Sequence, residues 1–314
     1  MSKILIIGIT GQDGTFLSDF LRKRGYEVFG TSRLPPKKSK TILRWDLKDS
    51  KALHEIFEKV SPDEVYNLAG FSTGTGMYEE TEELTEINAL SVVKILEEIR
   101  LHHSNTRFFH ASSSEIFGEP FETPQNEKTA FNPRSPYGAA KLFGTNLIKI
   151  YRERYNLFCT SGILYNHESH LRTENFVTKK IVVNSVKVKL GMIDSFVLGN
   201  LEARRDWGYA GDFVVAMHAI LQLEEPDDFI ISTGKLSSVR QLCEFCFNYL
   251  DLDYRNHVFC EQTLTRDNER MPLVGDNSKI IDKTSWKPTL SIEKILQEMI
   301  DKELELNKGI RNDI

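Results

Sequence analysis

Tyr137 and Lys141 stand four positions apart where a helical pattern begins, so both side chains are expected on one face of that helix. A tyrosine phenol ordinarily has a pKa of about 10. An adjacent lysine ammonium group, together with the cationic ring of an oxidised nicotinamide, would stabilise the phenolate and make it a usable base. The pair therefore indicates proton transfer beside a nicotinamide cofactor, although such a pair taken alone is more often an ordinary helix surface.

A polar turn follows the predicted strand that ends at Ala111; it comprises Ser112, Ser113, Ser114 and Glu115. In doubly wound folds, ligands bind at the edge of the sheet where the strands end. The turn is therefore expected beside the tyrosine and the lysine, where its hydroxyl and carboxyl groups could reach the same ligand.

Three glycines, Gly8, Gly11 and Gly14, follow a short apolar strand and open the first helix. A tight turn needs glycine, and a backbone that lies against a pyrophosphate leaves no room for a side chain. The helix that follows supplies amide donors and a dipole that favours an anion. The pattern predicts a dinucleotide-binding loop, with a plain glycine turn as the alternative.

The residues after the second predicted strand bear on the choice between NAD and NADP. An NAD site would present a carboxylate there for the ribose hydroxyls, yet the junction ends in Ser32 and Arg33, and Glu27 lies too early, within the strand. A guanidinium group pairs well with a 2′-phosphate. The sequence therefore favours NADP, against the alternative that Arg33 is a solvated loop residue.

Strands and helices alternate through the first half of the chain. Apolar runs predict strands at 3–9, 26–31, 41–45, 64–68, 107–111 and 158–164, and helical periodicity predicts helices at 15–24, 50–60, 83–100 and 137–155. This alternation is typical of an α/β fold with a doubly wound parallel sheet of the Rossmann type. Polar interruptions later in the chain predict a smaller, discontinuous α/β lobe that ends in short helices and loops.

These patterns suggest a division of the chain into two parts. We expect residues 1–164 and 209–235 to form a dinucleotide-binding domain, residues 165–208 and 236–305 to form a substrate-binding lobe, and residues 306–314 to form a tail. The smaller lobe should close over the carboxyl edge of the sheet, where the ligand is expected.

The composition excludes several classes of function. The 314 residues include 40 Lys and Arg against 45 Asp and Glu, a net charge of -5. Nucleic acid is not an expected partner, because its binding needs clustered positive charge. No apolar run is long enough for a signal-peptide core or a membrane span, so we expect no membrane association and a cytoplasmic location.

Four cysteines in a chain of this size do not form a disulfide framework, which indicates a reducing compartment. Cys243 and Cys246 form a CxxC motif, but they lie in an apolar, helix-like stretch and no second CxxC accompanies them. We interpret them as buried core thiols rather than a metal or redox site, and we expect no metal-binding residues in the chain.

Longer strings of the sequence resemble one family. The spaced glycines, the string NLAG at 67–70, the serine-rich turn and Tyr-x-x-x-Lys are similar to the extended short-chain dehydrogenase/reductase superfamily. The strings GITGQDG, ASSSEIFG, PRSPY, NHES, FVTKK, GNL with RDWG, and WKP resemble the GDP-mannose 4,6-dehydratase family; they begin at positions 8, 111, 133, 166, 176, 199, 205 and 286. The resemblance spans most of the chain.

The resemblance implies roles for individual residues. Ser113 matches a catalytic hydroxyl, Glu115 the acid/base carboxylate, and Tyr137 with Lys141 the catalytic pair. The implied cofactor-binding residues are Gly8, Gly11, Gln12, Asp13, Gly14, Arg33, Asp46, Leu47, Leu68, Ala69, Tyr137 and Lys141. The implied substrate-binding residues, which would hold a nucleotide sugar, are Ser72, Asn166, Lys180, Arg205, Arg266 and Glu269.

The implied reaction is an internal redox elimination. It converts a GDP-hexose or GDP-heptose to a 4-keto-6-deoxy sugar, with hydride moving from C4 to C6 and water leaving. A nucleotide-sugar 4-dehydrogenase, 4-epimerase or 4-keto reductase would use the same fold and stays open as an alternative, as does a cofactor-binding regulator without turnover. The segments after Ala69 and around Met271 depart from the family's usual sequence, which leaves the sugar open.

The resemblance also implies a homodimer. Apolar faces of the predicted helices 83–100 and 137–155 would pair with their two-fold mates in a four-helix bundle. The loop after Thr31 is shorter than the arm that joins such dimers, so a tetramer is the less expected assembly.

Overall fold

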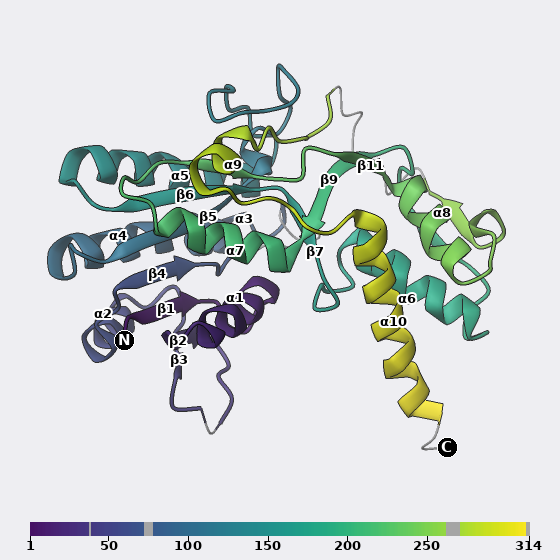
Figure 1. The fold of residues 1–314 in the computed structure, drawn as a ribbon, viewed down its shortest axis with the longest axis horizontal. Coiled ribbons are helices and arrows are strands. Elements are labelled where there is room, and N and C mark those ends of the chain that lie inside the picture. Colours follow the sequence, from purple (N-terminus) through teal and green to yellow (C-terminus); the bar gives the residue numbers. More distant parts are fainter. Residues whose placement is uncertain (38, 72–77, 262–270, 312–314) are drawn as a thin grey trace.

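The computed structural model describes residues 1–37, 39–71, 78–261 and 271–311. Its main sheet has seven parallel strands in the order β10-β6-β5-β4-β1-β2-β3 (Figure 1). These strands are β1 (Lys3–Ile7), β2 (Glu27–Ser32), β3 (Ile42–Arg44), β4 (Glu64–Asn67), β5 (Arg107–Ser113), β6 (Cys159–Leu164) and β10 (Phe229–Ile231). The order reverses at β1 and β4, the kind of switch point where such sheets bind ligands.

Helices cover both faces of this sheet. One face carries α1 (Gln12–Lys23), α7 (Ala210–Leu221) and α9 (Ser278–Thr284), and the other carries α2 (Ser50–Val60), α4 (Ser91–His102) and α5 (Pro136–Tyr155). The prediction of a doubly wound α/β fold is therefore confirmed.

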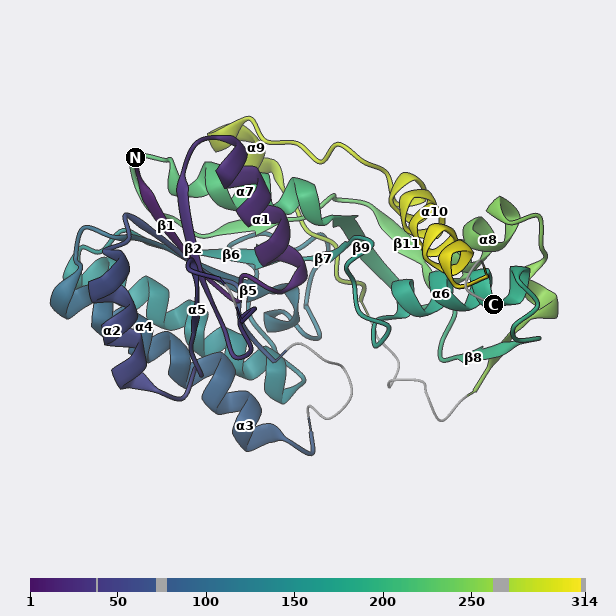
Figure 2. The same ribbon diagram turned by 90° about the horizontal axis from the view of Figure 1, so that it is seen from below.

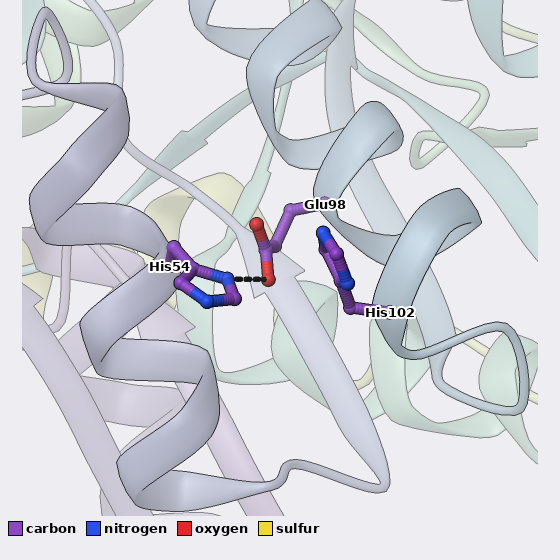
Figure 3. A group of neighbouring side chains, drawn as sticks. All are labelled: His54, Glu98 and His102. Atoms are coloured by element: carbon purple, nitrogen blue, oxygen red, sulfur yellow. Dashed lines mark hydrogen bonds and ion pairs between the residues drawn. The ribbon is translucent and has the colours of Figure 1, made fainter.

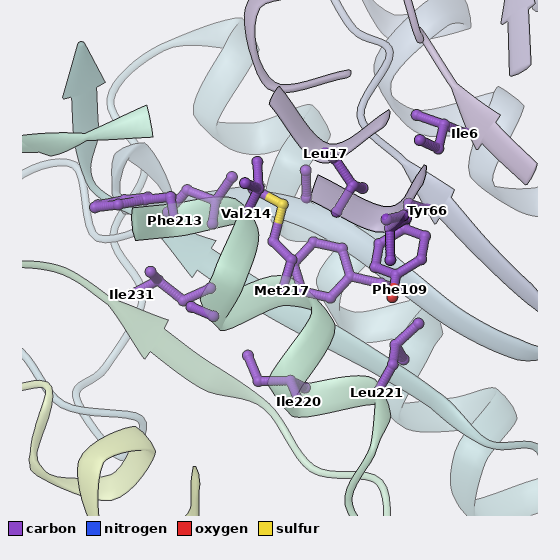
Figure 4. Packing of buried hydrophobic residues seen from close by; sticks show 14 of the residues in the cluster. Ile6, Leu17, Tyr66, Phe109, Phe213, Val214, Met217, Ile220, Leu221 and Ile231 are labelled. Atoms are coloured by element: carbon purple, nitrogen blue, oxygen red, sulfur yellow. The ribbon is translucent and has the colours of Figure 1, made fainter. Parts of the chain in front are cut away.

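Strand β1 shows why its sequence is apolar at every position. Ile4 and Ile6 join the core under α1 and α7, whereas Leu5 and Ile7 join the core under α2 and α4. A strand covered on both faces needs apolar side chains on both, which produces a continuous run rather than an alternating one. Figure 4 shows the first of these cores, where Leu17 and Met217 pack near Tyr66 and Phe109.

A second group of elements lies beside the main sheet (Figures 1 and 2). It contains the helices α6 (Val177–Lys189), α8 (Val239–Tyr249) and α10 (Ile292–Arg311), a small sheet of β7 (Asn166–Glu168), β9 (Arg204–Tyr209) and β11 (Leu236–Ser238), and the pair β8 (Phe196–Leu198) and β12 (Val258–Cys260). The core between the helices includes Cys243 and Cys246, both fully buried. The interpretation of these cysteines as core thiols is confirmed.

Two expected helices differ from those observed. The predicted helix 83–100 is divided into α3 (Thr81–Thr85), a π-helical turn η1 (Glu86–Leu90) and α4. The chain does not end in short helices only, because α10 has 20 residues and continues to Arg311, beyond the start of the expected tail. Within the described ranges, no helix is both long and apolar enough to cross a membrane.

Candidate active site

The glycine loop between β1 and α1 is packed too closely for side chains. Gly8 has a φ of +88°, and a Cβ atom there would lie 2.9 Å from the backbone nitrogen of Ala69. A Cβ atom at Gly14 would lie 2.3 Å from the carbonyl oxygen of Gly8. At Gly11 the nearest atom would be 3.4 Å away, an ordinary contact. The fold itself therefore requires Gly8 and Gly14, whereas it would tolerate a methyl group at Gly11, which caps α1 without a side chain.

Two residues of this loop are held by the segment around β7. Gln12 donates a hydrogen bond to the carbonyl of His167 (3.0 Å) and accepts one from the hydroxyl of Ser169 (2.8 Å). Asp13 lies 2.9 Å from Nε2 of His167. Since Nδ1 of the same ring lies 2.7 Å from the carbonyl of Tyr165, both ring nitrogens face acceptors and the imidazole carries a proton on each.

The charges of Asp13 and His167 support each other. Burial alone would raise the pKa of Asp13, but the facing imidazolium outweighs it and holds this pKa below its ordinary value. Burial alone would lower the pKa of His167, but Asp13 outweighs it and holds that pKa above its ordinary value. The sequence analysis identified Asp13 as a cofactor residue but missed His167, whose partner is 154 positions away.

The polar turn after β5 is anchored by its own backbone. Ser113 caps the short helix η2 (Ser114–Ile116) by accepting a hydrogen bond from the backbone N–H of Glu115 (3.2 Å), and its side chain is hydrogen-bonded to Tyr137. A Cβ atom at Gly138 would lie 2.4 Å from the carbonyl oxygen of Glu115, so α5 begins directly against this turn. The structure thus brings the predicted hydroxyl, carboxylate and phenol together at the carboxyl end of β5.

Lys141 lies one turn further along α5. Its ammonium nitrogen is 5.8 Å from the centre of the Tyr137 ring and donates a hydrogen bond to the carbonyl of Ala111 (2.9 Å). Burial lowers the pKa of Lys141 to about 8. Burial also raises the pKa of Tyr137 to about 12, although the hydrogen bond with Ser113 opposes this rise. Both predicted members of the pair are therefore perturbed toward their neutral forms in the absence of a ligand.

Two further buried polar residues lie near Lys141. A Cβ atom at Gly70 would lie 2.8 Å from the side-chain oxygen of Asn88 and 3.3 Å from the lysine nitrogen. The side chain of His110 is also buried, and burial together with the charge of Lys141 holds its pKa well below its ordinary value. His110 is therefore neutral and adds no charge beside the lysine. Sequence reasoning identified neither Asn88 nor His110.

The loops after β2 and β3 enclose an open surface cavity of about 420 Å³, lined by Arg33, Leu34, Arg44 and Asp46. Two guanidinium groups at one cavity favour an anion such as a phosphate. Arg33 and Asp46 were predicted as cofactor residues, and Arg44 was not. The sequence could have indicated Arg44 as well, because it lies at the end of the third predicted strand.

The remaining predicted residues fall into two groups. Leu68 donates a backbone hydrogen bond to Ile7 (3.0 Å), which places the loop that begins with Leu68 and Ala69 beside the glycine turn, and Leu47 packs with the core under α2. Among the predicted substrate residues, Asn166 lies on β7, Arg205 on the neighbouring strand β9 and Lys180 on α6. Ser72, Arg266 and Glu269 lie outside the described residues.

Comparison with known proteins identifies the family of the chain. The family model described as "GDP-mannose 4,6 dehydratase" matches residues 5–299. The chain belongs to the GDP-mannose 4,6-dehydratase family. It is 38% identical to GDP-mannose 4,6 dehydratase 1 of Arabidopsis thaliana over 97% of this chain and 90% of that protein, and 37% identical to GDP-mannose 4,6 dehydratase of Homo sapiens over 96% and 91%.

Solved structures share the fold of this member of the GDP-mannose 4,6-dehydratase family. RMD from Pseudomonas aeruginosa complexed with NADPH superposes with a TM-score of 0.84 at 19% identity, covering 96% of this chain and 99% of that one. The dTDP-glucose 4,6-dehydratase from Bacillus anthracis in complex with NAD has a TM-score of 0.84 at 16% identity, with 98% of each chain covered. At these identities, the likeness extends to the fold alone.

Proposed function

We propose that this chain is an NADP-dependent GDP-mannose 4,6-dehydratase-like enzyme that converts a GDP-hexose or GDP-heptose to its 4-keto-6-deoxy derivative. The observation that carries the proposal is the convergence of Ser113, Glu115, Tyr137 and Lys141 at the carboxyl end of β5. A phenol, a cation and a separate carboxylate at one point provide for both an oxidation and an elimination. The curated relatives that carry this activity in their names support the same substrate class.

The oxidation step uses Tyr137 as the base. Its phenolate accepts the proton of the sugar C4 hydroxyl, while Ser113 holds the C4 oxygen by a hydrogen bond. NADP held at the glycine loop would supply the hydride acceptor for C4 and the hydride donor for C6. Lys141 would hold the cofactor ribose and stabilise the phenolate through its charge.

The elimination step uses Glu115. The C4 ketone makes the C5 hydrogen acidic, so the carboxylate can remove it as a proton. The C6–O bond then breaks, and the leaving hydroxyl group is protonated and departs as water. Addition of the hydride at C6 and of a proton at C5 completes a 4-keto-6-deoxy sugar, with no net oxidation or reduction.

The cofactor assignment rests on two regions of the chain. The glycine loop has no space for side chains at Gly8 and Gly14, and the end of α1 that faces the switch point suits a pyrophosphate. Arg33 and Arg44 line the same cavity beside β2 and β3 and would pair with a 2′-phosphate. The carboxylate that would favour NAD is absent at Ser32, which supports NADP.

The substrate would lie between two lobes. We propose residues 1–164 and 209–235 as the dinucleotide-binding domain and residues 165–208 and 236–305 as the nucleotide-sugar lobe. Asn166, Lys180 and Arg205 would hold the nucleoside diphosphate, and we assign the protein to the cytoplasm.

The assembly we propose is a homodimer through α4 and α5. Leu101 on α4 and Phe143 and Ile150 on α5 are large apolar side chains that are 57%, 42% and 51% exposed. Phe143 and Ile150 lie seven residues apart, so they share one face of α5. Burying them against a second copy would remove this apolar area from water.

Isotopic labelling tests the reaction. Purified protein is incubated with GDP-mannose, and in parallel with a GDP-heptose, each deuterated at C4, and the products are analysed by mass and NMR. The expected product has lost one water and carries the deuterium at C6. Glu115→Gln should still allow C4 oxidation but slow water loss by about 10²- to 10⁴-fold.

A different product would support one of the alternatives. A 4-keto sugar that keeps its C6 oxygen, with one reduced cofactor per turnover, would identify a 4-dehydrogenase and overturn the dehydratase assignment. Tyr137→Phe is the matched variant, because it should block the first hydride transfer and so leave no 4-keto sugar at all.

A further inference from the structure

We propose that His54, Glu98 and His102 form a binding site for a divalent transition-metal cation, with Zn²⁺ as the preferred ion. The site lies on the outer surface between α2 and α4. Both ribbon views place these helices at the opposite end of the molecule from α6 and α8 (Figures 1 and 2). Glu98 and His102 lie in the last turns of α4, just before the amino end of β5, whereas the polar turn with Glu115 follows the carboxyl end of that strand, so the two sites are separate.

The three side chains converge from two helices. Glu98 and His102 are one helical turn apart on α4, and His54 faces them from α2 (Figure 3). Each residue offers one ligand atom, and these atoms all lie within 4.8 Å of one another. The Nδ1 atom of His54 already lies 2.9 Å from Oε1 of Glu98, and the two imidazole rings are 5.0 Å apart.

These distances are close to those of a tetrahedral zinc site. Zinc bonds to nitrogen and oxygen are about 2.0 to 2.1 Å long, which places neighbouring ligand atoms about 3.3 Å apart. The distance between Nδ1 of His54 and Oε1 of Glu98 would increase by about 0.4 Å. The other distances between ligand atoms would decrease by at most about 1.5 Å. His54 is exposed enough to turn, since 47% of its side chain is accessible, whereas Glu98 is 10% accessible and already fixed.

The carboxylate of Glu98 is largely buried beside a third histidine. Nε2 of His103 lies 3.6 Å from Oε1 of Glu98 and 3.5 Å from Glu58. Neither distance is a hydrogen bond, so burial rather than His103 restricts the Glu98 side chain, which is 10% accessible and loses little further freedom when the metal binds. Glu98 therefore supplies a fixed oxygen, and the two histidines adjust to the ion.

The set of donors selects the ion. Two imidazole nitrogens and one carboxylate oxygen suit Zn²⁺ and other late first-row divalent ions, whereas Mg²⁺ and Ca²⁺ prefer oxygen donors throughout. Because both histidines are exposed, a water molecule can complete the fourth position. Binding would join α2 to α4 and stabilise the folded chain, since the unfolded chain does not hold the three residues together.

Zinc titration of the full-length chain, without a histidine tag and after dialysis against EDTA, tests the site. Isothermal titration calorimetry should find one Zn²⁺ per chain with micromolar affinity. His102→Ala and His54→Ala should each weaken binding at least tenfold, whereas His257→Ala, which removes a histidine stacked on Phe247 of α8, should leave it unchanged. Saturating Zn²⁺ should raise the Tm by about 3 to 6 °C, and millimolar Mg²⁺ should not.

Two results would overturn the proposal. One is the absence of zinc binding at 100 µM free ion, a concentration about 100 times the expected Kd. The other is binding of equal strength in the double variant H54A/H102A, which would locate the ion elsewhere. Circular dichroism checks that each variant is folded. Because the site is remote from Tyr137, dehydratase activity of the EDTA-treated chain tests the proposed function independently.

Discussion

Replacement of Lys141 by methionine is the sharpest test of the proposed catalytic pair. Methionine has a similar length but no charge, so it removes the ammonium group 5.8 Å from the Tyr137 ring. At that distance, and with an effective dielectric constant of about 20, the ammonium stabilises a phenolate by about 3 kcal/mol. That energy corresponds to about 2 pKa units. We therefore expect kcat/KM at pH 7.5 to fall about 100-fold in Lys141→Met.

The shape of the pH profile adds a second, independent signature. In the free enzyme Lys141 loses its proton first, near pH 8, and Tyr137 loses its proton near pH 12. Between about pH 8 and 12 the most abundant form is a phenol beside a neutral amine. It contains the same number of protons as the reactive form, which is a phenolate beside an ammonium. The population of the reactive form therefore rises with pH up to about 8 and is level between about 8 and 12.

The wild-type and variant profiles should consequently diverge only at low pH. Without Lys141, the phenolate population rises about tenfold per pH unit through pH 10, with no plateau. The loss of kcat/KM in Lys141→Met relative to wild type should thus be about 100-fold below pH 8 and only a few-fold near pH 9.5.

The assay is water loss from GDP-mannose at saturating NADP between pH 6 and 10, with thermal unfolding of each variant as a check of folding. Lys149→Met, which removes an exposed lysine from the same helix, is the matched control and should behave as wild type. A deficit that stays constant across this pH range would refute the reasoning, because it would mean that Lys141 acts by holding the cofactor and not through its charge.

Four further substitutions test the predicted cofactor residues. Gly14→Ala should lower the free energy of unfolding by about 2 to 3 kcal/mol, because its Cβ would meet the backbone of Gly8. Gly11→Ala should unfold like wild type yet bind NADP weakly. Chemical denaturation measures the first effect, and NADPH fluorescence measures the second. Arg33→Ala should weaken NADP about 10- to 100-fold without affecting NAD, and equal loss for both would exclude a contact with the 2′-phosphate. Asp13→Asn should destabilise the fold most between pH 3.8 and 6.5. The reason is that the ion pair with His167 is lost below the lowered pKa of Asp13 and above the raised pKa of His167. A difference in denaturation midpoint between variant and wild type that does not change with pH would contradict this.

Local patterns were sufficient to predict much of the fold and of the catalytic turn. The spacing of Tyr137 and Lys141 requires only that one helix forms, and the polar turn after Ala111 requires only that one strand ends there. The glycines of the first loop have a direct steric cause in Gly8 and Gly14. Each of these signals is contained within a few consecutive residues.

Features built from distant segments could not be predicted in the same way. Asp13 and His167 are 154 positions apart, and His54 and Glu98 are 44 apart, so only the folded sheet brings each pair together. The break in the predicted helix 83–100 also has a tertiary partner. Asn88, in the π-helical turn, both accepts a hydrogen bond from and donates one to the backbone of Phe71, at 2.9 Å each, a contact that no helical periodicity contains.

The same π-helical turn links the fold to the electrostatics of the site. Asn88 and the ammonium group of Lys141 both come within reach of the position that a side chain of Gly70 would occupy, so a larger residue there would crowd both groups. The carbonyl of Ala111 then holds the lysine, and the neutral His110 adds no competing charge. The spacing of the catalytic pair is a property of one helix, but its pKa values are set by burial among three other segments. For this reason the sequence predicted which residues form the pair, whereas their order of ionisation emerged only from the structure.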